Sequence, residues 1–168
     1  MKSIFHCPII IFFILHTTLA LGGEPQPSRS FIEKARMATH VVVGKMESIK
    51  VIDRASGKLV NEPNDTLGDM QCFEAVVILD EIMANDPRHP LRVGARVKIR
   101  YGSRKSDTLS NNKLRIDKTR IYWLTQDSEI AVRDNFFFPF YGEAALCELL
   151  EHKEEVRAVV SRIATTLK

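Results

Sequence analysis

Three segments rich in β-branched and alternating apolar residues restrict this chain to a fold built mainly from β-strands. They span residues 39–52, 72–83 and 93–101, and turn-forming residues separate them. Residues 114–116 together with 121–124 predict a fourth strand region, and residues 130–132 predict the start of a fifth. Five strands joined mostly by turns predict a small closed β-barrel, because closure removes the exposed edges that such apolar strands would leave.

Two helices are expected to flank the strands. Ser30 and Glu33 fit a capping box, which predicts a short helix over residues 31–38. Residues 143–167 carry apolar residues at helical spacing, which predicts one long amphipathic helix at the C-terminal end. Within the first predicted strand, Gly44 predicts a bend or a β-bulge.

The N-terminal 20 residues have the pattern of a cleavable export signal. Lys2 precedes an apolar run over residues 4–15, and Thr18-Leu19-Ala20 places small residues where a signal peptidase cleaves. Cleavage is expected after Ala20, with Gly22 as the second choice. The run is shorter than the roughly 20 apolar residues that a spanning helix needs, although an uncleaved N-terminal anchor is the alternative.

Removing residues 1–20 from the 168 leaves 148, which is the size of one ordinary domain. Residues 21–29 form a Gly/Pro-rich leader, so a single domain over residues 30–168 is expected. No further stretch is long and apolar enough to predict a stable membrane span after cleavage. The signal predicts that the mature chain is periplasmic or secreted.

Two cysteines remain in the mature chain, Cys72 and Cys147. An even number in an exported chain predicts a disulfide, which would join the second strand to the C-terminal helix. The loop closed in this way is worth about 4 kcal/mol in the chain-entropy view. The alternative is a pair of buried free thiols.

Positive charge gathers in the middle of the chain. Residues 86–120 contain eleven lysines and arginines against three aspartates, although the whole chain has a net charge of only +3. Such asymmetry indicates an anionic partner. The candidate anion-binding residues lie on or beside the third predicted strand, the last two of them alongside it if that strand pairs with the fourth: Arg92, Arg96, Lys98, Arg100, Lys113 and Arg115. The alternative is that Glu74 and Asp80 neutralise a solvated strand face.

The strand segments resemble a known group of secreted proteins. The matching pieces are residues 38–45, 73–79, 94–99 and 122–124, which cover much of residues 38–125. They are similar to the OB-like barrel of the netrin module, the fold of the tissue inhibitors of metalloproteinases. The resemblance implies a five-stranded OB-like barrel and a protease-inhibitor-like role. Those inhibitors bind the catalytic zinc through an N-terminal cysteine, whereas the mature chain here is expected to begin at Leu21 or Gly23.

No set of residues indicates catalysis, and the chain is not expected to be an enzyme. The mature histidines His40, His89 and His152 lack neighbours at metal-ligand spacing, so neither a metal nor a cofactor is expected. His40 is expected to be a partly buried residue at a strand end, and Asp86 with His89 is expected to stabilise a Pro-rich loop. The aromatic residues within 136–141 form either a binding platform or, as we expect, a plug for one barrel end or a seat for the C-terminal helix.

These observations favour an exported, non-enzymatic binding or interaction module. Its partner is expected to be a protein or a polyanion, without specific recognition of nucleic acid. The alternative is a protease-inhibitor-like protein of the netrin-module type, which depends on the resemblance alone.

Overall fold

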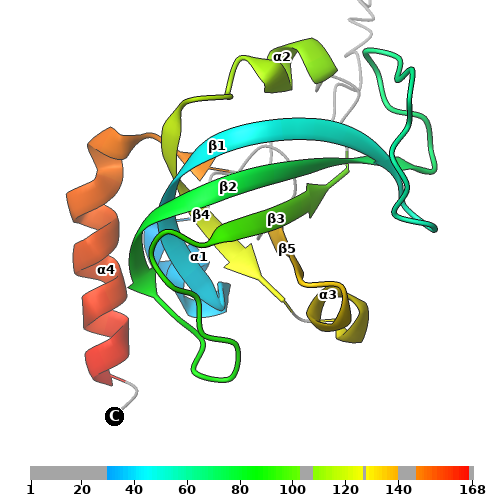
Figure 1. The fold of residues 1–168 in the computed structure, drawn as a ribbon. Coiled ribbons are helices and arrows are strands. Elements are labelled where there is room, and N and C mark those ends of the chain that lie inside the picture. The colour runs from blue at the N-terminus through cyan, green and yellow to red at the C-terminus, as the bar shows by residue number, and fades with distance from the viewer. Residues whose placement is uncertain (1–29, 103–107, 127, 140–146, 167–168) are drawn as a thin grey trace, which may run out of the picture.

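The computed structural model describes residues 30–102, 108–126, 128–139 and 147–166 (Figure 1). The expected signal peptide and the leader lie outside these residues. The order of elements is α1 (Phe31–Met37), β1 (His40–Asp53), β2 (Gln71–Ala84), β3 (Arg96–Tyr101), α2 (Leu109–Lys113), β4 (Thr119–Thr125), α3 (Glu129–Arg133), β5 (Phe136–Pro139), β6 (Cys147–Glu148), the 3₁₀ turn η2 (Leu150–His152) and α4 (Lys153–Thr166).

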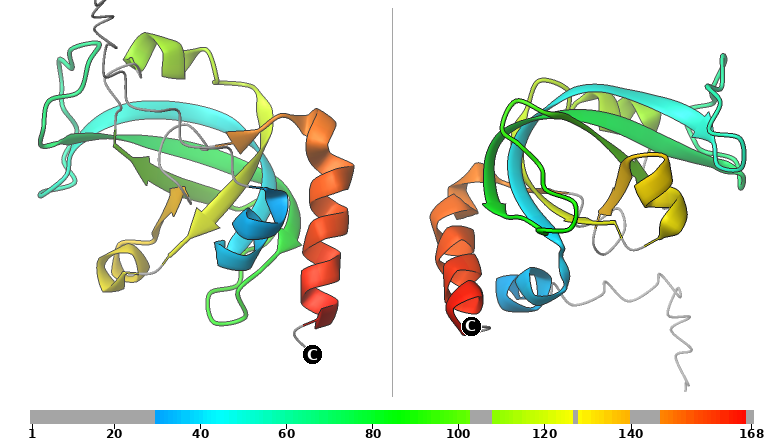
Figure 2. Two further views of the ribbon diagram at one scale, coloured as in Figure 1. Left: turned by 180° about the vertical axis from the view of Figure 1, so that it is seen from behind. Right: turned by 60° about the horizontal axis from the view of Figure 1, so that its bottom comes forward.

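The strands form one mainly antiparallel sheet that closes on itself. Its order is β1-β2-β3-β5-β4-β6, and an additional pairing of β1 with β4 makes a ring of five strands. The β3–β5 pair is parallel, whereas the other pairs are antiparallel. Figure 2 shows the ring with α1 and α4 side by side on one flank and α3 on another. The prediction of a mainly β fold built on five strands is therefore confirmed.

The apolar core has two parts because β1 and β4 bury both of their faces. Inside the ring, Val42, Phe73, Ile99 and their neighbours form one cluster. Outside it, Val41 and Trp123 pack with Val156 and Val160 of α4. This double burial explains why residues 41–43 form a continuous apolar run rather than an alternating one.

Gly44 bends β1 as expected. The β1–β2 register shifts between Val43 and Gly44, which is a β-bulge or a comparable irregularity. A Cβ atom at Gly44 would lie 2.6 Å from both Ile78 O and Val77 Cγ1. The close approach of β2 therefore requires glycine at this position. The capping box of α1 is also confirmed, since Ser30 and Glu33 cap each other's backbone N–H groups.

Residues 130–132 are helical, so the prediction of a strand there is wrong. Ser128 is the N-cap of α3, and its hydroxyl accepts a hydrogen bond from Ala131 N at 3.1 Å. The strand that follows is β5, which contains the first residues of the aromatic segment. Asn135 makes the sharp turn between the two with φ +49°, a left-handed conformation that asparagine tolerates.

Further boundaries also differ from expectation, among them the start of β3 at Arg96 instead of residue 93. Residues 114–116 are not part of the fourth strand, because they continue the turns after α2, and Leu114 is 74% exposed. The long C-terminal helix begins at Lys153 instead of residue 143. Just before it, Cys147 and Glu148 pair with β4, and Glu148 forms an ion pair with the buried Lys34 of α1. These sheet and side-chain contacts hold the segment extended although its apolar spacing is helical.

Candidate functional site: a basic cavity and a buried histidine network

A cavity of about 840 Å³ lies where the β1–β2 connection, β3, α3 and β5 meet. Four cationic side chains and one carboxylate line it: Arg54, Lys98, Arg100, Arg133 and Asp134. Alternation along β3 places Lys98 and Arg100 on the outer face of the ring, opposite the buried Val97 and Ile99. We call this the basic cavity. Its volume is in the range of small-molecule sites.

Arg100 is fixed in place by contacts on several sides. Its Nε donates to Glu74 Oε2 at 2.7 Å, and the guanidinium carbon lies 4.1 Å from the centre of the Phe136 ring. Glu74 is 3% exposed and also receives Lys50 at 3.0 Å. Burial is the largest influence on the pKa of Glu74 and raises it, but the bonds and charges of Arg100 and Lys50 together outweigh burial and lower that pKa.

The other three cations are less neutralised. Arg133 donates to its neighbour Asp134 at 2.9 Å, and this hydrogen bond is the main reason why the pKa of Asp134 is lowered, with Arg100 and Lys98 adding to the effect. Arg54 uses its Nε to reach Gln71 O at 2.8 Å. Within the described residues, neither Arg54 nor Lys98 makes an ion pair. The cavity therefore has a positive character.

Aromatic and apolar side chains complete its wall. Phe136 and Phe138 meet edge to face, with ring centres 5.1 Å apart. Phe138 is 38% exposed, and Ile130 of α3 is 56% exposed. Phe137, between the two phenylalanines, points into the ring and is buried. The expected aromatic plug is thus divided by strand alternation, with one ring in the core and two at the cavity. Residues 140–141 lie outside the described residues.

The predicted anion-binding residues are not all brought together. Lys98 and Arg100 line the cavity, but Arg96 forms two 2.9 Å bonds with Glu47. Arg92 lies in the β2–β3 connection. Lys113 ends α2 and Arg115 lies in the turn that follows it, so neither belongs to a strand, and the neighbour of β3 is β5 and not β4. The alternative was that Glu74 and Asp80 neutralise this strand face. It is correct for Glu74, which lies opposite Arg100, but the carboxylate that pairs with Arg96 belongs to Glu47 and not to Asp80.

Sequence reasoning missed Arg54 and Arg133. Arg54 follows β1 in a polar connection, and Arg133 ends a segment predicted as a strand. One signal could have identified α3. Ser128 is a good N-cap residue, and the acidic Glu129 follows it in the first turn of the helix. Nothing local indicated that either arginine would meet β3.

Cys72 borders the same cavity as a buried free thiol. Burial is the main cause that raises the pKa of this thiol. The expected disulfide is not formed in the structure. Cys147 pairs with Tyr122 in the sheet and Cys72 pairs with Ile52, and their strands β6 and β2 are not neighbours. A disulfide would need Cα atoms within about 7 Å.

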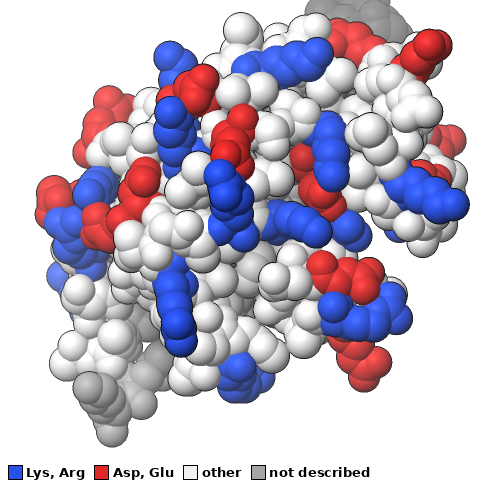
Figure 3. Space-filling model, in the orientation of Figure 1, with Lys and Arg blue, Asp and Glu red and all other residues white. Residues whose placement is uncertain are grey.

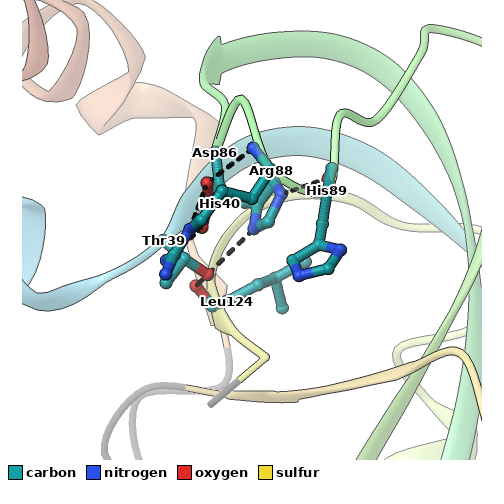
Figure 4. A network of polar contacts seen from close by, with 6 residues as sticks. All are labelled: Thr39, His40, Asp86, Arg88, His89 and Leu124. Atoms are coloured by element: carbon teal, nitrogen blue, oxygen red, sulfur yellow. Dashed lines mark hydrogen bonds and ion pairs between the residues drawn. The ribbon is translucent and has the colours of Figure 1, made fainter. Parts of the chain in front are cut away.

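A second polar cluster surrounds His40 at the start of β1 (Figure 4). His40 is fully buried, not partly buried as expected, and its ring lies edge-on to Phe137. Nε2 is 2.9 Å from His89 O, and Nδ1 is 2.9 Å from Thr39 Oγ1. A carbonyl can only accept, so Nε2 carries a proton and donates. The Thr39 hydroxyl also reaches Leu124 O at 3.1 Å, so its one proton is shared between that carbonyl and the unprotonated Nδ1 of the neutral ring.

The charge of His40 is set by burial. Loss of water is the largest cause that lowers its pKa, although the bond to His89 O and the charge of Asp86 oppose it. Asp86 is held by Arg88 through contacts of 2.6–3.1 Å, and these lower its pKa to about 2. The loop is thus stabilised as expected, but the Asp86–His89 bond joins the two backbones at 3.2 Å and not their side chains.

Among the described residues, no three His, Cys, Asp or Glu side chains come together as metal ligands. None of the helices that the structure describes is long and apolar enough to cross a membrane. The sequence matches no family model and no curated protein. The basic cavity and the His40 network are therefore interpreted from their geometry.

Proposed function

We propose that this chain is an exported, non-enzymatic binding module and that the basic cavity is its ligand site. The observation that carries the proposal is the convergence of Arg54, Lys98 and Arg133 on one cavity from three separate segments. Like charges brought together repel each other, so an anionic ligand would relieve the repulsion. Export is supported by the N-terminal signal pattern of the sequence.

We further propose that the five-stranded ring is an OB-like barrel. OB folds bind their ligands on the face of strands 2 and 3, between the loops that join strands 1–2 and 4–5. The basic cavity has this arrangement, since Arg54 lies between β1 and β2, Lys98 lies on β3, and Arg133 lies between β4 and β5. The position of the cavity thus supports both the fold and the site.

The test compares two triple variants of the mature chain. Arg54→Gln/Lys98→Gln/Arg133→Gln removes three exposed cations of the cavity, and Arg92→Gln/Lys113→Gln/Lys118→Gln removes three exposed cations elsewhere. Calorimetric titration with tripolyphosphate at low salt should show that the first variant loses at least about tenfold in affinity, or 1.4 kcal/mol. The second should change little, and wild-type affinity should fall as salt rises. Equal losses in both variants would refute a specific site.

A protease-inhibitor-like role of the netrin-module type is the second candidate. The observation that favours it is the closed ring of five strands with a flanking helix at each end of the chain. Inhibition of a metalloproteinase by the mature chain, retained in full by the cavity variant, would support this role over ligand binding at the cavity.

A further inference from the structure

The positive charge of β3 does not continue beyond the basic cavity. Arg96, the next outward residue along the strand, is neutralised by Glu47, and Lys113 and Arg115 belong to α2 and its following turn. On the face shown in Figure 3, basic and acidic side chains are interspersed and form no continuous basic stripe. A polymer such as a polysaccharide or a nucleic acid is held by a groove that follows its charged backbone. The cavity has the charge of an anion site without such a path.

The cations of the cavity also have different roles. Arg100 is already engaged by Glu74, and its guanidinium covers one side of the Phe136 ring. It therefore acts as part of the wall. Lys98 and the terminal nitrogens of Arg54 remain to meet a ligand. Arg133 adds its Nη1 on the α3 side, since its Nε and Nη2 reach the exposed Asp134 at 2.9 and 3.5 Å. Charge-assisted hydrogen bonds from these groups suit a compact anion such as a phosphate, a sulfonate or a carboxylate.

The apolar part of the wall lies beside these cations. Phe138 contacts Phe136 in an edge-to-face arrangement and is still more than one-third exposed. Ile130 is more than half exposed. An inorganic anion would leave both side chains in water. A flat ring stacked on Phe138 would cover them, and stacking on an aromatic side chain typically contributes about 1–3 kcal/mol.

We infer that the ligand of the basic cavity is a small organic anion that carries an aromatic ring, with its anionic group at Arg54, Lys98 and Arg133 and its ring against Phe138. The inference rests on the function proposed above and narrows its ligand class. Both the volume of about 840 Å³ and the absence of a basic path among the described residues agree with a single small molecule.

The experiment uses four probes with the mature chain: phenyl phosphate, cyclohexyl phosphate, inorganic phosphate and a heparin dodecasaccharide. The first two have similar size and the same anionic group, so their ratio isolates the effect of the aromatic ring. Phenyl phosphate should bind at least about fivefold more tightly than cyclohexyl phosphate. In Phe138→Leu, which keeps an apolar side chain at a position that is 38% exposed, the two affinities should become equal and that of inorganic phosphate should not change.

Equal affinities of phenyl and cyclohexyl phosphate for the wild-type chain would overturn the aromatic ligand but leave the proposed anion site in place. Equal weakening of the binding of all three phosphates in Phe138→Leu would also overturn the aromatic ligand. Tighter binding of the dodecasaccharide than of phenyl phosphate, lost in Arg54→Gln/Lys98→Gln/Arg133→Gln, would replace a small ligand with a polymer. If that triple variant binds every probe as the wild type does, both this inference and the proposed function fail.

Discussion

The His40 network and the basic cavity both place nitrogen-bearing side chains against the same sheet, but those of the first are buried and hydrogen-bonded, whereas most of those of the second are exposed. His40 is fully buried, and both of its ring nitrogens have a partner. At the cavity, cations from three segments meet with Asp134 as the one carboxylate in the lining. A buried polar group is stable only when it is hydrogen-bonded, whereas exposed like charges can remain because water screens them. The first region therefore serves the fold, and the second is where we propose that a ligand binds.

The largest effect that this comparison predicts is on folding. His40→Ala should lower the free energy of unfolding by about 3 kcal/mol, because it leaves a void beside Phe137 and removes the donor to His89 O. His89→Ala is the matched control, since it keeps the backbone carbonyl that His40 uses. Its cost should be well below that of His40→Ala in urea unfolding. Similar costs for the two variants would show that the network does not stabilise the fold.

Glu74 connects the two kinds of region, since it is buried like His40 but forms an ion pair with Arg100, which lines the cavity. Glu74→Gln should cost about 2 kcal/mol, because it leaves Arg100 without its buried carboxylate. Glu47→Gln breaks the more exposed pair with Arg96 and should cost less than about 1 kcal/mol. Folded Glu74→Gln should also bind tripolyphosphate more tightly, since a nearby negative charge is gone. Weaker binding would contradict the assigned role of Arg100.

Acid should destabilise the chain through His40. Its pKa is lowered in the folded state, so below the unfolded pKa of about 6.5 the unfolded chain binds more protons than the folded chain. Stability should therefore fall as the pH falls from about 6.5 toward the lowered folded pKa, by up to about 1.4 kcal/mol per pH unit. Urea unfolding between pH 7.5 and 5 measures this slope. His40→Gln should flatten it, and an unchanged slope would assign the pH dependence to other groups.

The smallest expected effect is on the stability of the cavity variant. Arg54→Gln/Lys98→Gln/Arg133→Gln should change the free energy of unfolding by less than about 1 kcal/mol, because the three side chains are exposed. Urea unfolding of this variant, set beside its loss of anion affinity, completes the contrast with His40→Ala. A large destabilisation would mean that the cations hold the β1–β2 connection and α3 in place rather than a ligand.

The strands were predictable because their signal is local. Phe73, Ala75, Val77 and Leu79 alternate and are all buried, as are Val97, Ile99 and Tyr101. Val93 belongs to the same pattern but is 64% exposed, since β3 begins at Arg96. Where a short cap or a sheet contact competes with spacing, as at Ser128 and at Cys147–Glu148, the predicted element was wrong. Export and the ligand of the cavity stay predictions.

By itself, the sequence determined a mainly β chain, the positions of β1 and β2, the capped helix α1 and the outward direction of Lys98 and Arg100. Each depends on neighbours within a few residues, through side-chain alternation or a cap. The tertiary structure decided that β5, and not β4, lies beside β3. That pairing brings Arg133 and Phe138 to Lys98, whereas Lys113 and Arg115 are absent from the site because they lie in α2 and the turn after it. Such contacts join residues far apart in the chain, and they are fixed by the closure of the ring and its two cores rather than by any local pattern.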